Sequence, residues 1–160
     1  MEPIRDNLAE IIELVAKDQG ADKKNVIAVL ENIRMLMNED KHLIVPVDWD
    51  RKTMSGTDIL DTPRGIGATL RSDVAMMLRQ IKGPDEKNWL VAFSSNNELL
   101  KGSPSFSFPG SVRQLLDVTM KTEDISGIVI NPFGAPFLLN KTLIQMILDT
   151  DKAVKENQYN

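Results

Sequence analysis

The stretch Ser126–Leu139, which reads S-G-I-V-I-N-P-F-G-A-P-F-L-L, decides the fold of this chain. An apolar run leads into Asn131-Pro132-Phe133-Gly134, and a second apolar run follows directly. Proline fixes φ at the first central position of a tight turn and glycine allows positive φ, so these residues predict the corner of a β-hairpin. Phe133 then either packs on the sheet edge or stays exposed as an apolar anchor for a partner or small ligand.

Further strands are expected in hairpins rather than in alternation with helices. The turn-forming sequence Gly83-Pro84-Asp85-Glu86-Lys87-Asn88 separates a predicted strand at 75–81 from the bulky apolar strand Trp89–Phe93. The β-branched run His42–Asp48 also predicts a strand. Because Pro46 cannot donate a ladder hydrogen bond, we expect that strand at a sheet edge or where the ladder is already broken.

The first forty residues predict an antiparallel pair of helices that docks on the rest of the chain. Apolar residues recur at helical spacing through 4–15, Gly20 provides a stop, and Asp22 is a candidate N-cap for the second helix. We expect the second helix to bury one apolar face, made by Val26, Ile27, Leu30, Ile33 and Met37.

Shorter helices are predicted by capping residues farther along the chain. Ser95-Asn96-Asn97-Glu98 and Ser111-Val112-Arg113-Gln114 are capping boxes, in which a serine is followed three residues later by Glu or Gln. Asn140 is expected to cap a last helix that carries Leu143 to Leu148, and the polar tail 151–160 is expected to fray.

These elements predict an α+β fold. A largely antiparallel sheet of about five strands, built from hairpins, is expected to be covered by the N-terminal helical hairpin and by the further helices. The chain of 160 residues fits one domain, at 1–150, that is large enough to fold without a metal or disulfide.

Composition argues against several classes of partner. The chain has no cysteine, which excludes disulfides, thiolate metal sites and cysteine nucleophiles. Its net charge is −4 and no basic block is longer than Lys23-Lys24, so we expect neither nucleic-acid binding nor binding to a membrane surface. No apolar run is long enough to span a bilayer and the first residues lack a signal-peptide layout, so we expect a cytoplasmic protein.

The sequence predicts no catalytic or metal-binding constellation. His42 is the only histidine, with no second metal ligand and no nucleophile placed beside it. Gly65-Ile66-Gly67 lacks the spacing and the lysine of a phosphate-binding loop. Four aspartates crowd one region without the order of a calcium-binding loop, and we interpret them as solvated loop residues: Asp48, Asp50, Asp58 and Asp61. We therefore expect neither enzymatic activity nor a cofactor.

Three segments, in the same order along the chain, resemble the SseB-like (enhanced serine sensitivity) protein family. Gly127–Leu139 resembles the family's hairpin signature, His42–Asp48 its L-x-V-P-V first strand, and Val91–Leu99 its apolar strand ending in F-[ST]-S-x-x-E-L. The resemblance covers most of 1–150 and departs in the loop Arg51–Gly67. It implies a small bacterial cytoplasmic α+β domain, in a family without an established enzymatic mechanism.

The expected function is therefore a non-catalytic protein-binding or regulatory module. The alternative is a sensor domain that receives a small carboxylate, such as an amino acid, at a helix N-terminus beside a polar corner. The eight methionines also leave a homodimer open. The predicted binding residues are Asn131, Pro132, Phe133 and Gly134 of the hairpin corner, with Ser94, Ser95 and Glu98 at the helix start.

Overall fold

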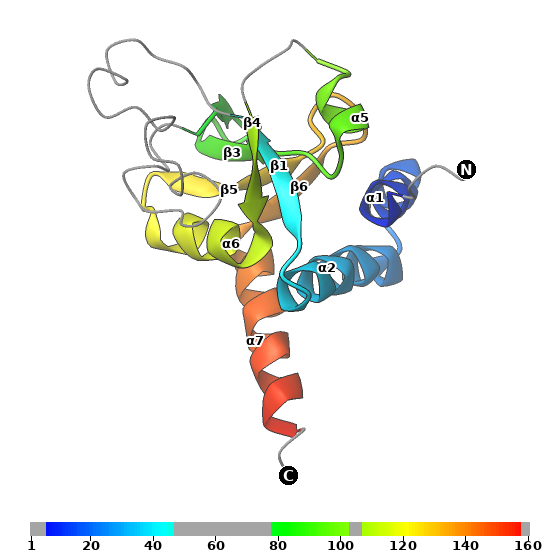
Figure 1. The fold of residues 1–160 in the computed structure, drawn as a ribbon. Coiled ribbons are helices and arrows are strands. Elements are labelled where there is room, and N and C mark those ends of the chain that lie inside the picture. Colours follow the sequence, from blue (N-terminus) through cyan, green and yellow to red (C-terminus); the bar gives the residue numbers. More distant parts are fainter. Residues whose placement is uncertain (1–5, 47–77, 103–106, 158–160) are drawn as a thin grey trace, which may run out of the picture.

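The computed structural model describes residues 6–46, 78–102 and 107–157 of the chain. Two helices come first, and strands and helices then follow in mixed order (Figure 1). The elements are α1 (Asn7–Lys17), α2 (Lys23–Asn38), β1 (His42–Pro46), β2 (Gln80–Lys82), β3 (Asn88–Ala92), α5 (Asn96–Leu99), β4 (Ser107–Ser111), α6 (Val112–Lys121), β5 (Ile125–Ile130), β6 (Phe137–Asn140) and α7 (Lys141–Asn157).

The strands form a four-stranded sheet and a two-stranded sheet within the described residues. The larger sheet has the order β2-β3-β5-β6, in which β2–β3 and β5–β6 are the two predicted antiparallel hairpins. The strand predicted at 75–81 is observed only as Gln80–Lys82, and its residues 75–77 lie outside the described residues. The two hairpins are joined by a parallel pairing of β3 with β5, which the sequence did not predict. A parallel pair needs a long crossover, and here α5, β4 and α6 lie between the two strands in sequence. The α+β class with a largely antiparallel sheet is confirmed, and the pairing of β3 with β5 makes the large sheet mixed.

The smaller sheet pairs β1 with β4 and is attached to the larger one at the end of β3. Ile44 and Phe93 exchange two backbone hydrogen bonds, of 2.9 and 2.8 Å. Pro46 is the last residue of β1, and its carbonyl accepts the Arg79 N–H at 3.1 Å. The proline, which has no N–H to donate, therefore lies at the end of the strand. Residues 47 and 48 of the predicted strand lie outside the described residues.

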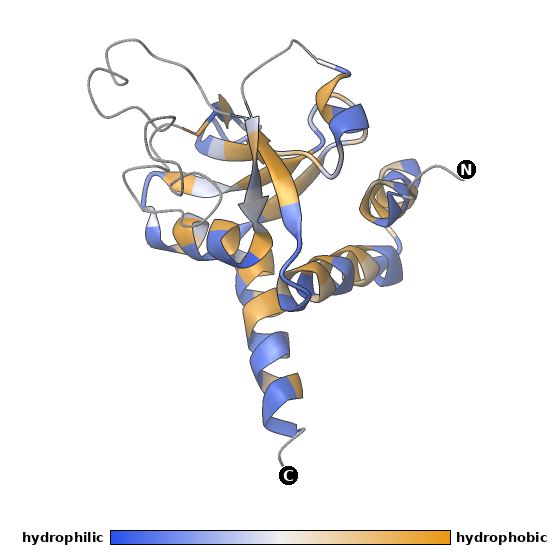
Figure 2. Cartoon of the chain, viewed as in Figure 1, coloured by the Kyte–Doolittle hydropathy of each residue, from blue (hydrophilic) through white to orange (hydrophobic). Residues whose placement is uncertain are grey.

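The hydrophobic core lies between the four-stranded sheet and the helices. The pairing of the strands places Leu90, Ile128 and Leu139 side by side, and α6 and α7 contribute Leu115, Ile144 and Ile147 to the same cluster. Each fully buried aliphatic side chain of this kind stabilises the fold by about 1.5–3 kcal/mol. Figure 2 shows the apolar strands at the centre of the molecule and a hydrophilic end of α7 that projects away from it.

The break between the two N-terminal helices lies where the sequence predicts, at Gly20 and Asp22, whereas the cap of α1 at Asp6 was not predicted. Asp6 caps α1 and Asp22 caps α2, each accepting a backbone N–H of its own helix at 3.0 Å. Gly20, with φ +76°, follows the end of α1 in the left-handed conformation that glycine tolerates best. The predicted buried face of α2 is wrong at Ile27, which is 55% exposed, because the buried stripe includes Val29 instead.

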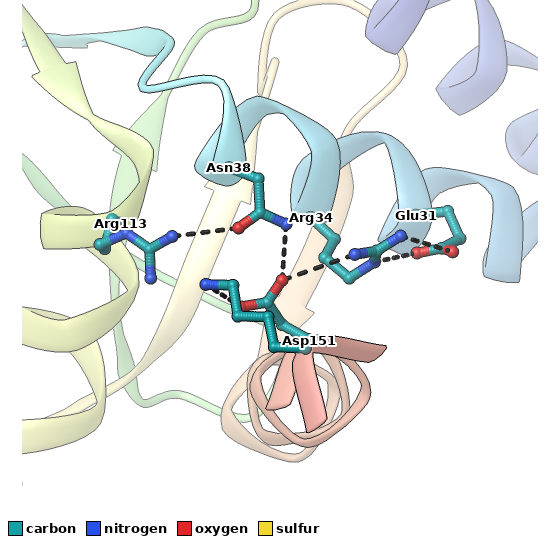
Figure 3. Close-up of polar contacts among 6 residues, drawn as sticks. Glu31, Arg34, Asn38, Arg113 and Asp151 are labelled. Carbon is teal, nitrogen blue, oxygen red and sulfur yellow. Dashed lines mark hydrogen bonds and ion pairs between the residues drawn. The ribbon is translucent and has the colours of Figure 1, made fainter. Parts of the chain in front are cut away.

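The prediction that the chain frays from Asp151 is wrong, because α7 continues to Asn157. Asp151 is only 5% exposed and is held by residues of two helices (Figure 3). It accepts a hydrogen bond from Asn38 Nδ2 at 2.5 Å and forms ion pairs with Arg34 at 3.5 Å and Lys155 at 3.0 Å. Burial alone would raise the pKa of Asp151, but the hydrogen bonds from Asn38 and Lys155, with help from Arg34, outweigh it and lower that pKa.

Within the parts of the chain that the structure describes, no helix is both long and apolar enough to cross a membrane.

Candidate functional site

The hairpin corner is a β-turn closed by the Gly134 N–H, which donates to the Asn131 carbonyl at 3.2 Å. Pro132 and Phe133 occupy its central positions, as the sequence predicts. The residue with positive φ is Asn131, at +57°, and the interpretation of Gly134 as that residue is wrong. Glycine suits position 134 for a different reason, because a Cβ there would lie 2.6 Å from Oε1 of the buried Glu98 and would force that side chain to shift.

Asn131 is buried, and its side chain links the hairpin corner by hydrogen bonds to the loop that connects β3 with α5. Its side chain is 1% exposed, and its Oδ1 accepts the Ser94 N–H while its Nδ2 donates to Ser94 Oγ, both at 2.9 Å. Ser94 Oγ in turn donates to Asp6 Oδ2 at 2.6 Å, at the start of α1. The structure thus brings Asn131 and Ser94 together, but these polar groups satisfy one another, as buried polar groups generally do.

Ser95 and Glu98 also have partners inside the fold. Ser95 Oγ caps α5 by accepting the Glu98 N–H at 3.3 Å, which confirms the predicted N-cap. The buried Glu98 carboxylate lies against Gly134 and forms an ion pair with Lys101. The hydrogen bond between Lys101 and the Glu98 carboxylate has the largest effect on the pKa of Lys101. It raises that pKa, while desolvation acts in the opposite direction. Ser95 and Glu98 therefore hold α5 in place against the hairpin corner.

Phe133 has one packed face and one open face. Its ring stacks on Phe93, with ring centroids 5.7 Å apart and planes inclined by 29°. The ring also covers Gly102, where a Cβ would overlap it. Phe133 is nevertheless 45% exposed, and Leu100, two residues before Gly102, is exposed as well. Packing on the sheet edge and exposure as an apolar anchor are therefore compatible for Phe133. The contacts on one face of the ring fix the orientation in which the other face is exposed.

A cleft of about 610 Å³ lies on the other side of Ser94, between the N-terminal helices and the β3–α5 loop. Ser94 and Ser95 are the predicted residues that line it, whereas Phe133 and Gly134 are not among its lining residues. Among the residues that sequence analysis missed is one face of α2 with its C-cap, where Asn32, Met35, Leu36 and Glu39 recur at helical spacing. The full lining is Asp6, Asn7, Leu8, Asn32, Met35, Leu36, Glu39, His42, Leu43, Ser94, Ser95, Asn96 and Asn97.

The described residues contain no group of three or more His, Asp or Glu side chains placed to hold a metal ion. The four aspartates of the predicted acidic loop and the Gly65-Ile66-Gly67 segment lie outside those residues. His42 is exposed and lines the cleft, and no hydrogen bond of its side chain is found in the described part of the chain.

The family model described as the SseB protein N-terminal domain matches residues 8–146 of the chain. The chain belongs to this family. The match spans both hairpins of the SseB domain, the corner around Phe133 and almost the whole lining of the cleft. It ends within α7, before Asp151. No curated protein and no solved structure gives a significant match to the chain.

Proposed function

We propose that this SseB domain is a non-catalytic module that binds a protein partner through the apolar corner around Phe133. The observation that carries the proposal is the half-exposed Phe133 ring, fixed from behind by Phe93 and Gly102. Aromatic side chains of this kind are frequent hot spots of interfaces. A ring that is already fixed in one orientation also loses little conformational entropy when a partner covers it.

The neighbouring polar residues support binding rather than catalysis. Asn131, Ser94, Ser95 and Glu98 all hydrogen-bond or ion-pair within the fold. They keep the corner rigid and leave its apolar surface as the part available to a partner. The alternative, a sensor of a small carboxylate, gains no support from the cleft, because its acidic lining residues, Asp6 and Glu39, would repel that ligand.

Site-specific photo-cross-linking tests the proposal. The photoreactive amino acid benzoylphenylalanine is placed at position 133, where it preserves an aromatic ring, or at Leu14, an exposed residue on α1. The cross-linking is done in the cell that makes the protein, and captured proteins are identified by mass spectrometry. We expect a partner that is captured from position 133 and not from position 14.

The purified partner then gives a quantitative test. Phe133→Ala should weaken its binding by about thirtyfold or more, which corresponds to a hot-spot loss of about 2 kcal/mol. Leu14→Ala is the matched control and should leave the affinity unchanged within about twofold. Equal binding by native protein and a folded Phe133→Ala variant would refute the proposal.

A further inference from the structure

The cleft between the N-terminal helices and the β3–α5 loop carries a second inference, which does not depend on the corner around Phe133. One wall is the face of α2 that carries Asn32, Met35 and Leu36, with the C-cap Glu39, and the other is formed by residues 94–97, at the end of the β3–α5 loop and the start of α5. Leu8 and Leu43, both buried, also line it. Figure 1 shows α2 in blue and α5 in green, so residues far apart in sequence line the cleft. A volume of about 610 Å³ is in the range of clefts that bind ligands.

Side-chain amides on both walls have no hydrogen-bond partner among the described residues. Asn32 lies on α2, Asn96 and Asn97 lie at the start of α5, and no hydrogen bond of their side chains is found among the residues that the structure describes. A carboxamide has a donor and an acceptor, as a peptide group has. The cleft therefore presents the groups that pair with a polypeptide backbone.

The charge of the cleft has one sign. Its ionised lining residues in the described chain are Asp6 and Glu39, and no lysine or arginine lines it. Both oxygens of Asp6 already accept hydrogen bonds, from Ala9 and Ser94. Glu39 has no ion pair or side-chain hydrogen bond within the described residues, so it is the carboxylate that can receive a cation.

Apolar surface lies beside that carboxylate. Met35, one turn before Glu39 on α2, is 53% exposed, and Leu36 lines the same wall. Lysine and arginine lay their aliphatic stems along such surface while the charged head reaches a carboxylate. Methionine adapts its shape to different stems. We infer that the cleft binds an extended polypeptide segment that carries a lysine or arginine, with the basic head at Glu39 and the backbone at the asparagines.

A small amine is a poorer fit to these observations. It could pair with Glu39, but it would leave the amides of the opposite wall unused. A nucleic acid or another anionic ligand would meet two carboxylates, and the described lining residues include no lysine or arginine to compensate them.

Selection from a random-peptide display library against the immobilised full chain tests the inference. We expect the selected peptides to be enriched in lysine or arginine, and synthetic versions are then measured by fluorescence anisotropy. Failure to select any peptide above background, or selection without basic enrichment, would overturn the inference.

Charge reversal at Glu39 locates the binding site. Glu39→Lys should weaken binding of a selected peptide by about tenfold or more, whereas Glu13→Lys, a reversal at an exposed α1 residue outside the cleft, should change it by less than about twofold. Lysine at 39 follows the end of α2, where a cation suits the helix dipole, so this variant should fold.

The charge swap completes the test. A peptide whose basic residue is replaced by glutamate should bind the Glu39→Lys variant more tightly than it binds the native chain. Equal losses at positions 39 and 13, or no recovery by the swapped peptide, would contradict the assigned site. Phe133→Ala should leave peptide affinity unchanged within about twofold, so failure of this inference and failure of the corner proposal are separate results.

Discussion

Replacement of Asn131 should destabilise the fold through the loss of its side-chain hydrogen bonds. Asn131→Gly removes the acceptor of the Ser94 N–H and the donor to Ser94 Oγ, each at 2.9 Å. Each lost bond costs about 0.5–1.5 kcal/mol, and a buried N–H left without an acceptor costs about 1–3 kcal/mol. We therefore expect Asn131→Gly to lower the free energy of unfolding by about 2–4 kcal/mol.

Two further substitutions of Asn131, by alanine and by aspartate, should differ from Asn131→Gly in stability. Its φ of +57° is easy for glycine and unfavourable for alanine, so Asn131→Ala should be less stable than Asn131→Gly by about 1 kcal/mol. Asn131→Asp keeps an acceptor for the Ser94 N–H but loses the donor to Ser94 Oγ, whose proton already goes to Asp6. Because the aspartate also buries a carboxylate charge beside Ser94 Oγ and Asp6, this variant should be no more stable than Asn131→Gly.

Equilibrium unfolding in urea, followed by far-ultraviolet circular dichroism, measures these differences if the slopes are equal. Asn97→Ala is the control, because Asn97 is exposed and has no side-chain hydrogen bond in the described chain; it should change stability by less than about 0.5 kcal/mol. The reasoning is refuted if Asn131→Gly lies within about 1 kcal/mol of the native protein, or if the alanine and glycine variants are equally stable.

Two further predictions concern the packing at Gly134 and the pH dependence of folding. Gly134→Ala should cost about 1–3 kcal/mol in urea unfolding, because its Cβ would lie 2.6 Å from Glu98 Oε1, and the cost should largely disappear in a Glu98→Ala background. The folded pKa of Asp151 is lowered, so its stabilisation is present above the unfolded carboxyl pKa of about 4 and is lost as pH falls through the lower folded value. Asp151→Asn should therefore show a smaller loss of thermal midpoint than the native protein on acidification below pH of about 4, and equal losses in the two proteins would contradict this account.

The predictable parts of the fold are those whose interactions are local. The serine caps at 95 and 111 accept the N–H three residues ahead, and Asn140 caps α7 in the same way. The corner at Asn131 closes within four residues. Such interactions depend only on neighbouring residue types, so they can be derived from one sequence.

The rest depends on contacts between distant segments. The partner of Asn131 is Ser94, 37 residues away, and the partner of Asp151 on α2 is Asn38, 113 residues away. Aspartate in a polar tail predicts solvation, and only the arrival of Asn38 and Arg34 makes its burial favourable. The face of α2 with Asn32, Met35 and Leu36 likewise gives no sign in the sequence that residues 94–97 lie opposite it and complete a cleft. The parallel pairing of β3 with β5 has no local signal at all.

The two proposed binding surfaces, the corner and the cleft, differ in chemistry because the fold distributes hydrogen-bonding capacity unevenly between them. The polar side chains of the corner are paired within the fold, so an apolar ring is what remains for a partner. The cleft keeps amides and the Glu39 carboxylate unpaired within the described residues, so it suits a polar and basic segment. Ser94 belongs to both surfaces, since it lines the cleft and bonds to Asn131. The hydrogen bonds from Asn131 through Ser94 to Asp6 therefore fix the position of the Phe133 corner relative to the cleft. The same hydrogen bonds that stabilise the fold also set the spacing of the two proposed binding surfaces.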